Sequence, residues 1–224
     1  MFVKICGVTT EEDALLAVGM GADALGFNFV SGSPRQIRPA TARDIVRRLP
    51  GGVLTVGIFQ NELKERVVEI THEAGLQAAQ LHGRETSNDS SWVAQRIPYL
   101  IKAFAAGDAA IDHLDRYSAS AVLVDAPEPG SGEVFDWSML DGRERGRPLI
   151  LAGGLHPQNV GQAVRIVRPW GVDVASGVES SPGTKDPVKV REFVLNARAA
   201  EAAMEPTGEE FDPDAPHPYD WRDE

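Results

Sequence analysis

Ala121-Val122-Leu123-Val124-Asp125 is a run of four apolar residues that ends in a single carboxyl group. A second run, Leu149-Ile150-Leu151-Ala152, has the same character and is followed by two glycines. Strands that are apolar on both faces are typical of a parallel sheet whose two faces are both covered. The two runs therefore predict buried parallel strands.

Similar short runs recur on both sides of these two. The eight β-like runs are Phe2-Cys6, Ala24-Val30, Val53-Phe59, Ala78-His82, Leu100-Ala105, Ala121-Asp125, Leu149-Ala152 and Val172-Ala175. Helix-like segments lie between most of them, the clearest being Glu11-Met20, Thr41-Leu49, Glu62-Ala74, Ser90-Arg96, Pro157-Val167 and Pro187-Ala200. Thr10 has the position of a helix N-cap, and Pro157 and Pro187 fit the first turn of a helix, where proline is tolerated.

Eight strand-helix units in a chain of this length predict an α/β fold, a single closed (β/α)8 TIM barrel over residues 1–203. The competing architecture is a doubly wound open sheet. That fold usually has five or six strands and a glycine-rich fingerprint after the first strand, which Cys6-Gly7-Val8-Thr9 does not supply. We therefore favour the barrel.

The net charge of −11 is concentrated at the C-terminal end of the chain. Residues 201–224 hold nine acidic residues and one arginine, a net of −8, so the rest of the chain carries only −3. We expect residues 204–224 to form a disordered acidic tail, because its composition cannot repay the entropy of ordering. Its aromatic residues Phe211, Tyr219 and Trp221 leave a docking role open.

Composition also limits which partners and which cellular compartment we expect. The content of 42% hydrophobic and 25% charged residues is ordinary for a globular protein. An acidic chain without a basic stripe argues against a nucleic acid partner. No apolar run is long enough to span a membrane, and we find no signal-peptide pattern. With a single cysteine as well, the chain is expected to be cytoplasmic.

In a TIM barrel the active site lies at the C-terminal ends of the strands. Cys6, the only cysteine, closes the first run and is either a small buried hydrophobe or a reactive thiolate. Asp125 closes the sixth run and either keeps a proton for donation or caps a loop. Lys4 lies one layer below Cys6 on the same face, where it either favours the thiolate or simply pairs with Asp173.

Two consecutive strand ends suggest a phosphate site. Gly153-Gly154 after the seventh run and Ser176-Gly177 after the eighth offer backbone N–H groups that no large side chain obstructs. The alternative is that these glycines only form tight turns. No metal site is indicated by the neighbouring residues.

Arg35 and His82 are the other candidates for contact with a ligand. Arg35 lies in a long loop and either grips a substrate carboxylate in a two-pronged manner or is a solvated loop residue. His82 is either a polar wall of the pocket or a rim residue whose hydrogen bonds are satisfied elsewhere.

Taken together and in order, these residues resemble the phosphoribosylanthranilate isomerase family of tryptophan biosynthesis. The matching motifs are Lys4-Ile5-Cys6-Gly7, Gly26-Phe27, Ser33-Pro34-Arg35, Gln80-Leu81-His82-Gly83, Val124-Asp125, Gly130-Ser131-Gly132, Phe135-Asp136-Trp137, Leu151-Ala152-Gly153-Gly154-Leu155 and Val172-Asp173-Val174-Ala175-Ser176-Gly177-Val178-Glu179. The resemblance runs from residue 3 to about residue 193. Gln36 stands where the family pattern has an aromatic residue after the arginine.

The resemblance implies an Amadori rearrangement of N-(5'-phosphoribosyl)anthranilate, without a cofactor or metal. Asp125 would be the general acid and Cys6 the general base, while Arg35 would orient the anthranilate carboxylate. The loops at Gly153-Gly154 and Ser176-Gly177 would hold the phosphate. The expected partner is this small phosphoribosyl substrate, and the protein is expected to be a monomer or a homodimer.

Two alternatives from other functional classes remain. A phosphosugar-binding lyase or synthase such as indole-glycerol-phosphate synthase would call for a lysine as general acid, and only Lys4 and Lys102 lie within the predicted strands. A nonenzymatic scaffold, with the acidic tail as its interaction element, would require the set of strand-end residues to be accidental.

Overall fold

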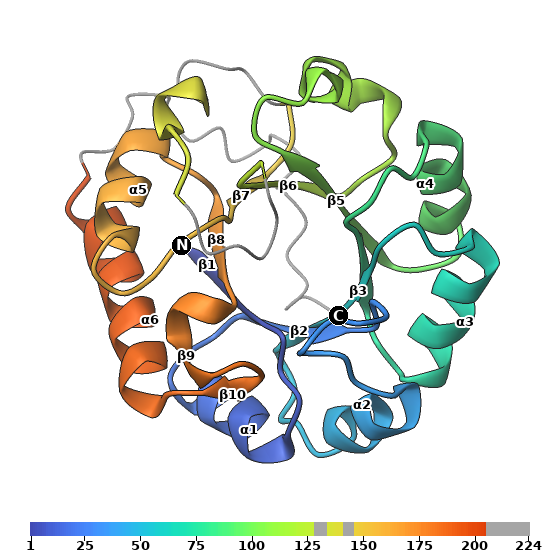
Figure 1. The fold of residues 1–224 in the computed structure, drawn as a ribbon, viewed down its shortest axis with the longest axis horizontal. Coiled ribbons are helices and arrows are strands. Elements are labelled where there is room, and N and C mark those ends of the chain that lie inside the picture. The colour runs from blue at the N-terminus through green and yellow to red at the C-terminus, as the bar shows by residue number, and fades with distance from the viewer. Residues whose placement is uncertain (128–133, 141–145, 205–224) are drawn as a thin grey trace, which may run out of the picture.

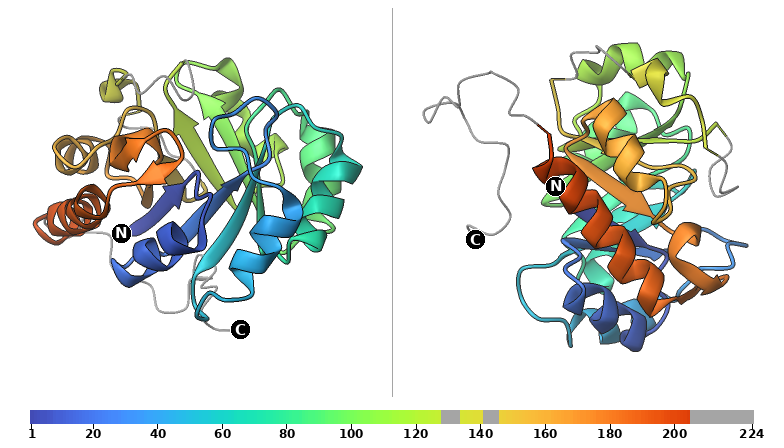
Figure 2. Two further views of the ribbon diagram at one scale, coloured as in Figure 1. Left: turned by 60° about the horizontal axis from the view of Figure 1, so that its bottom comes forward. Right: turned by 90° about the vertical axis from the view of Figure 1, so that its left-hand side faces the viewer.

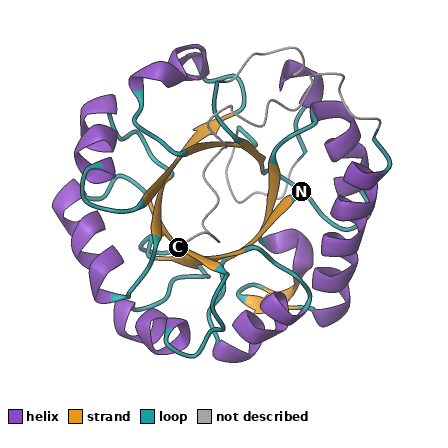
Figure 3. Cartoon of the chain, turned by 180° about the vertical axis from the view of Figure 1, so that it is seen from behind, coloured by secondary structure: helices purple, strands orange, loops and turns teal. Residues whose placement is uncertain are grey.

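The computed structural model describes residues 1–127, 134–140 and 146–204. Eight parallel strands form one closed barrel, in which β8 pairs with β1 to complete the ring. The strands are β1 (Phe2–Cys6), β2 (Ala24–Asn28), β3 (Leu54–Phe59), β4 (Ala78–Leu81), β5 (Tyr99–Ala105), β6 (Ala121–Asp125), β7 (Leu149–Leu151) and β8 (Gly171–Val174). Figures 1 and 3 show this ring from opposite sides, with the helices outside it. The predicted TIM barrel is confirmed.

The outer layer is mostly α-helical. Its α-helices are α1 (Glu11–Gly19), α2 (Pro39–Val46), α3 (Lys64–Glu73), α4 (Ser87–Ala94), α5 (Val160–Val167) and α6 (Pro187–Ala202). Three 3₁₀ segments follow β5, β6 and β8, namely η1 (Ala109–Arg116), η2 (Trp137–Leu140) and η3 (Ser176–Val178). A short antiparallel hairpin of β9 (Glu179–Ser181) and β10 (Thr184–Lys185) precedes α6. In the right-hand view of Figure 2, α6 lies beside the N-terminus, whose ammonium group pairs with Glu201.

Local hydrogen bonds explain why two elements begin or end at residues other than the predicted ones. β2 stops at Asn28 rather than Val30, because Asn28 Oδ1 accepts from the Val30 N–H at 2.8 Å and turns the chain. α4 begins at Ser87 rather than Ser90, because Thr86 and Asp89 form a reciprocal capping box.

The predicted helix starts are confirmed in two cases and wrong in one. Thr10 caps α1 by accepting from the Asp13 N–H at 3.1 Å, and Pro187 lies in the first turn of α6. Pro157 does not open α5. It lies in a turn, and the helix starts after Asn159, which also ties that turn to the loop after β7 through a 2.9 Å hydrogen bond to the Gly154 carbonyl.

The interior of the barrel is filled by side chains. The buried set is Phe2, Ala24, Leu54, Val56, Ala78, Ile101, Ala103, Ala121, Leu123, Ile150 and Ala152. At the N-terminal end of the barrel, Phe2 stacks on Trp170 with ring centroids 4.4 Å apart. One layer up, Lys4 and Asp173 are partners in register and form a buried ion pair of 2.8 Å. Because side chains alternate along a strand, Cys6 lies in the next layer, at the C-terminal mouth.

Two predictions fall outside the described residues. The motif Gly130-Ser131-Gly132 belongs to a stretch that the structure does not describe. Of the predicted acidic tail, residues 205–224 also lie outside the described part, so the tail stays a prediction.

Candidate active site

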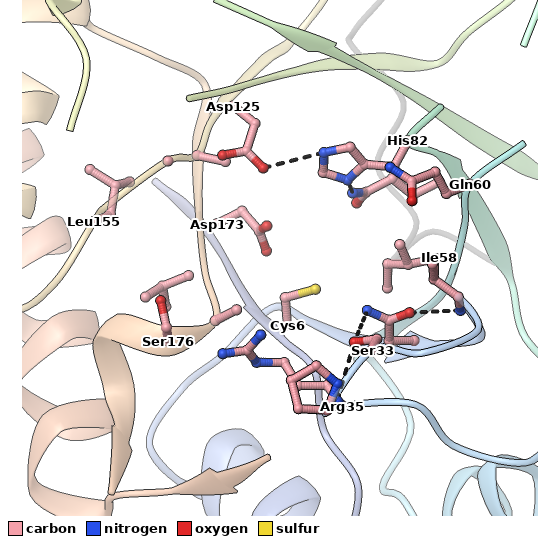
Figure 4. Close-up of a pocket in the computed structure, with 18 of the residues that line it drawn as sticks. Cys6, Ser33, Arg35, Ile58, Gln60, His82, Asp125, Leu155, Asp173 and Ser176 are labelled. Atoms are coloured by element: carbon pink, nitrogen blue, oxygen red, sulfur yellow. Dashed lines mark hydrogen bonds and ion pairs between the residues drawn. The ribbon is translucent and has the colours of Figure 1, made fainter. Parts of the chain in front are cut away.

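A cavity of about 450 Å³ opens at the C-terminal end of the barrel. Seven of the eight predicted site residues line it: Cys6, Arg35, His82, Asp125, Gly153, Gly154 and Ser176. Figure 4 shows Cys6 and Asp125 at this cavity, with Asp173 between them in the view. Their strands, β1 and β6, are three positions apart in the ring of eight. The two groups thus face one space from well-separated strands, close to the predicted opposite sides.

The thiol of Cys6 is held between the charged layer below it and β2. Cys6 and Gly26 are partners in register, and a Cβ atom added at Gly26 would lie 2.8 Å from Sγ. Burial raises the pKa of the Cys6 thiol, and the nearby Lys4 and Lys185 ammonium groups offset this only in part. Lys4 pairs with Asp173, as one of the two interpretations expected, and its effect on the thiol stays a prediction.

Asp125 has a buried carboxyl group with partners on both oxygens. Oδ1 accepts from the Ala126 N–H at 2.7 Å, and Oδ2 lies 3.2 Å from His82 Nε2 at an angle too poor for a hydrogen bond. The Gln80 side-chain nitrogen lies 2.9 Å from His82 Nδ1. His82 is thus a polar wall of the cavity rather than a rim residue.

Arg35 reaches the cavity from the loop after β2, but it is already paired. Its Nε and Nη2 atoms each donate to one carboxylate oxygen of Glu179 at 2.8 Å. The side edge of the guanidinium is therefore occupied within the protein. The terminal edge of the guanidinium, formed by Nη1 and the outer hydrogen of Nη2, remains for a substrate carboxylate. The predicted two-pronged contact is therefore restricted to that edge.

The glycine loops after β7 and β8 lie side by side. Gly153 and Gly154 both have positive φ, +85° and +61°, and within the described residues their N–H groups donate to no protein acceptor. Gly177 is the one predicted site residue that does not line the cavity. A Cβ atom at Gly177 would lie 1.9 Å from the Leu155 carbonyl oxygen, so this glycine lets the two loops pack together.

Sequence reasoning gave no role in the cavity to several polar residues that line it. These are Asn28, Gln60, Gln80 and Asp173. The signal that marks three of them is a polar residue within or at the end of an otherwise apolar strand. Sequence reasoning also missed Glu179, which accepts hydrogen bonds from Arg35, and Lys185, which donates to the carbonyl oxygen of Cys6.

Neither strand lysine is available as a general acid. Lys4 and Lys102 do not line the cavity, and each is buried and ion-paired, with Asp173 and Glu85 respectively. In the part of the chain that the structure describes, no group of three or more His, Cys, Asp or Glu side chains is arranged to hold a metal ion. In the same part, no helix is long and apolar enough to cross a membrane.

The fold and the site together define a TIM-barrel enzyme built for proton transfer. A thiol, two carboxyl groups and an imidazole share one cavity at the mouth of the barrel, next to a guanidinium group and two glycine loops. In this fold the catalytic groups lie at that mouth, and the loops after the last two strands frequently bind phosphate.

Comparison with known proteins agrees with this class. The sequence model of the family described as N-(5'phosphoribosyl)anthranilate (PRA) isomerase matches residues 3–196. The chain is 47% identical over 205 residues to the N-(5'-phosphoribosyl)anthranilate isomerase of Desulforudis audaxviator, which covers 88% of this chain and 98% of that relative. The crystal structure of phosphoribosyl anthranilate isomerase from Thermus thermophilus superposes with a TM-score of 0.83 at 42% identity, covering 89% of this chain and 99% of that one.

A further solved structure of this enzyme contains reduced 1-(o-carboxyphenylamino)-1-deoxyribulose 5-phosphate. It superposes with a TM-score of 0.80 at 41% identity, covering 89% of this chain and 99% of that one. The chain belongs to the N-(5'-phosphoribosyl)anthranilate isomerase family. It is an enzyme of tryptophan biosynthesis that isomerises N-(5'-phosphoribosyl)anthranilate to 1-(2-carboxyphenylamino)-1-deoxyribulose 5-phosphate by an Amadori rearrangement.

Proposed function

We propose that Asp125 and Cys6 carry out the two proton transfers of this rearrangement. Asp125 donates a proton to the ring oxygen of the ribose as the ring opens to an imine. Cys6 then removes the proton from the second sugar carbon, and the resulting enolamine tautomerises to the ketone. The observation that carries the proposal is that both side chains line the same cavity. General acid and general base contributions of this kind are each worth about 10²–10⁴-fold in rate.

The surroundings of the two groups fit these roles. A raised thiol pKa makes Cys6 a stronger base once it is deprotonated, and the Lys4 and Lys185 charges limit the cost of forming the thiolate. The His82 ring lies against Asp125, with Nε2 3.2 Å from Oδ2, and its polarity stabilises the carboxylate that remains after the proton has been donated.

We assign binding of the two anionic ends of the substrate to two different sets of residues in the cavity wall. Arg35 takes the anthranilate carboxylate on its terminal edge. The N–H groups of Gly153 and Gly154, which donate to no acceptor within the described residues, take the phosphate together with Ser176, as expected of the loops after the last two strands of this fold. Gly177 contributes by letting the two loops pack together. His82 forms a polar part of the cavity wall. No cofactor takes part in this proposal.

The wider setting of the enzyme is also proposed. Residues 1–203 would be the catalytic domain and residues 204–224 an accessory acidic tail, acting in the cytoplasm, as the single cysteine indicates. The working form would be a monomer or a homodimer, since the related enzyme of Thermotoga maritima is described as dimeric, with monomers generated from it.

The test replaces the acid and the base separately. In Cys6→Ala and Asp125→Asn we expect turnover, followed by loss of the anthranilate-type fluorescence of the substrate, to fall at least about a hundredfold each, because each removes one proton transfer. Asp44→Asn, the same chemical change at an exposed position of α2, should retain full activity. Near-normal turnover in either site variant, with circular dichroism unchanged, would remove that residue from its role.

A further inference from the structure

A cluster of charged side chains lies at the edge of the cavity. Arg35 lines the cavity, and the buried residues Glu179 and Lys185 lie behind it. We call these three residues the Glu179 cluster. Glu179 accepts both bonds from Arg35 at 2.8 Å, and its Oε1 also accepts from Lys185 Nζ at 2.9 Å. Both Glu179 and Lys185 are buried, with less than a tenth of their surface exposed. Two cations therefore share one carboxylate at the edge of the site.

Lys185 fixes the position of that carboxylate relative to the barrel. Its Nζ atom also donates to the carbonyl oxygens of Cys6 at 2.6 Å and Ala175 at 3.2 Å, at the ends of β1 and β8. Glu179 itself begins β9, and its own carbonyl accepts from Lys189 Nζ at 2.8 Å. The carboxylate is thus anchored to the strand ends that carry Cys6 and the phosphate loop.

Arg35 is held in one orientation as a result. Its aliphatic stem lies across Gly7, where an added Cβ atom would come within 2.4 Å of Arg35 Cδ. The stem fixes one end of the side chain and Glu179 fixes the guanidinium plane. Because a guanidinium presents five N–H donors in a rigid fork, occupying its side edge determines which edge faces the cavity.

We propose that Glu179 is a positioning residue for recognition of the substrate carboxylate. It holds the side edge of Arg35 and thereby directs the terminal edge toward the anthranilate ring. The inference rests on the assignment of Arg35 to that carboxylate. Glu179 does not touch the substrate in this scheme, and its effect is confined to ligands that carry the carboxyl group.

The test compares two ligands on Glu179→Gln. One is reduced 1-(o-carboxyphenylamino)-1-deoxyribulose 5-phosphate, and the other is its phenylamino counterpart without the carboxyl group. Calorimetry should show the Kd of the carboxylated ligand raised about tenfold, and the Kd of the counterpart changed by less than about twofold. In turnover of the natural substrate, KM should rise with kcat nearly unchanged, since the change affects binding of a remote group.

A competing electrostatic effect has the opposite sign. Neutralising Glu179 leaves the charges of Arg35 and Lys185 uncompensated, which by itself would strengthen binding of an anion. A lowered Kd for the carboxylated ligand would therefore overturn the proposal. Glu179→Asp keeps the charge but withdraws it by one methylene group, so it should also weaken binding of the carboxylated ligand. Glu192→Gln on the exposed face of α6 is the matched control and should leave both Kd values unchanged.

Arg35→Met separates failure of this inference from failure of the proposed function. If Arg35→Met does not reduce the preference for the carboxylated ligand, the assignment of Arg35 is wrong. If Arg35→Met removes the preference and Glu179→Gln retains it, Arg35 binds the carboxylate without help from Glu179. The second result would overturn the present inference alone.

Discussion

Cys6 is a residue whose ionisation can be measured directly, because the chain has no other cysteine. Burial raises the pKa of its thiol, so the thiolate forms only at higher pH than in a free cysteine. We expect the rate of alkylation by iodoacetamide to rise with pH to a midpoint above the value of about 8.5 of a free thiol. The same protein in concentrated urea should show the ordinary midpoint. A folded-state midpoint at or below the unfolded one would contradict the description of this site.

Gly26 is the residue that makes room for the thiol. A Cβ atom there would lie 2.8 Å from Cys6 Sγ and 3.1 Å from Cys6 Cα, so either the thiol or the strand must move in Gly26→Ala. We expect kcat to fall about 10- to 100-fold, since small misplacements of catalytic groups have effects of this size. Gly19→Ala in α1, where nothing lies within 4 Å of an added Cβ atom, should keep full activity. Equal activity of the two variants would show that the site tolerates a displaced thiol.

At the scale of elements, Lys102 on β5 organises the loop after β4, which carries His82. It is buried, and burial lowers the pKa of its ammonium group. Its three N–H groups are shared among four acceptors, which are Glu85 Oε2 at 3.0 Å and the carbonyl oxygens of Leu81, Gly83 and Ala103 at 3.2, 2.8 and 3.1 Å. Removing one member of such a pair leaves an uncompensated buried charge.

We therefore expect Lys102→Met to lower the free energy of unfolding by about 3–5 kcal/mol in urea titrations. The double variant Lys102→Met with Glu85→Gln should lose less than the single variant, because no charge is left unpaired. Lys64→Met, which breaks the half-exposed pair with Asp89, should cost at most about 1 kcal/mol. Additive losses in the double variant would mean that Lys102 and Glu85 do not act as a pair.

The elements show how far the sequence predicts this molecule. The eight strands are recognisable because both faces are buried, and the barrel topology then brings the ends of β1 and β6 to one mouth, which is why Cys6 and Asp125 were identified. The predicted ends of strands were less accurate where a side chain, rather than the backbone of the next strand, accepts a hydrogen bond. Asn28 does so at the end of β2. The Glu179 cluster was not predicted because it joins residues 144 positions apart, and no periodicity records such a pairing.

For the whole molecule, the described barrel is complete without the tail. β8 closes on β1, and α6 already packs beside β1 before residue 205. We expect deletion of residues 206–224 to leave kcat, KM and the melting temperature almost unchanged. A large loss of either activity or thermal stability would show that the acidic segment docks on the barrel.

The stack of Phe2 on Trp170 determines how the enzyme exchanges its ligands. Together with the filled interior, it closes the N-terminal end of the ring, so the described residues leave no passage through the barrel. Substrate therefore enters, and product leaves, through the cavity at the C-terminal end of the barrel. Each turnover then ends only when the ketone product has vacated the same opening that the next molecule enters, which makes product a direct competitor of substrate.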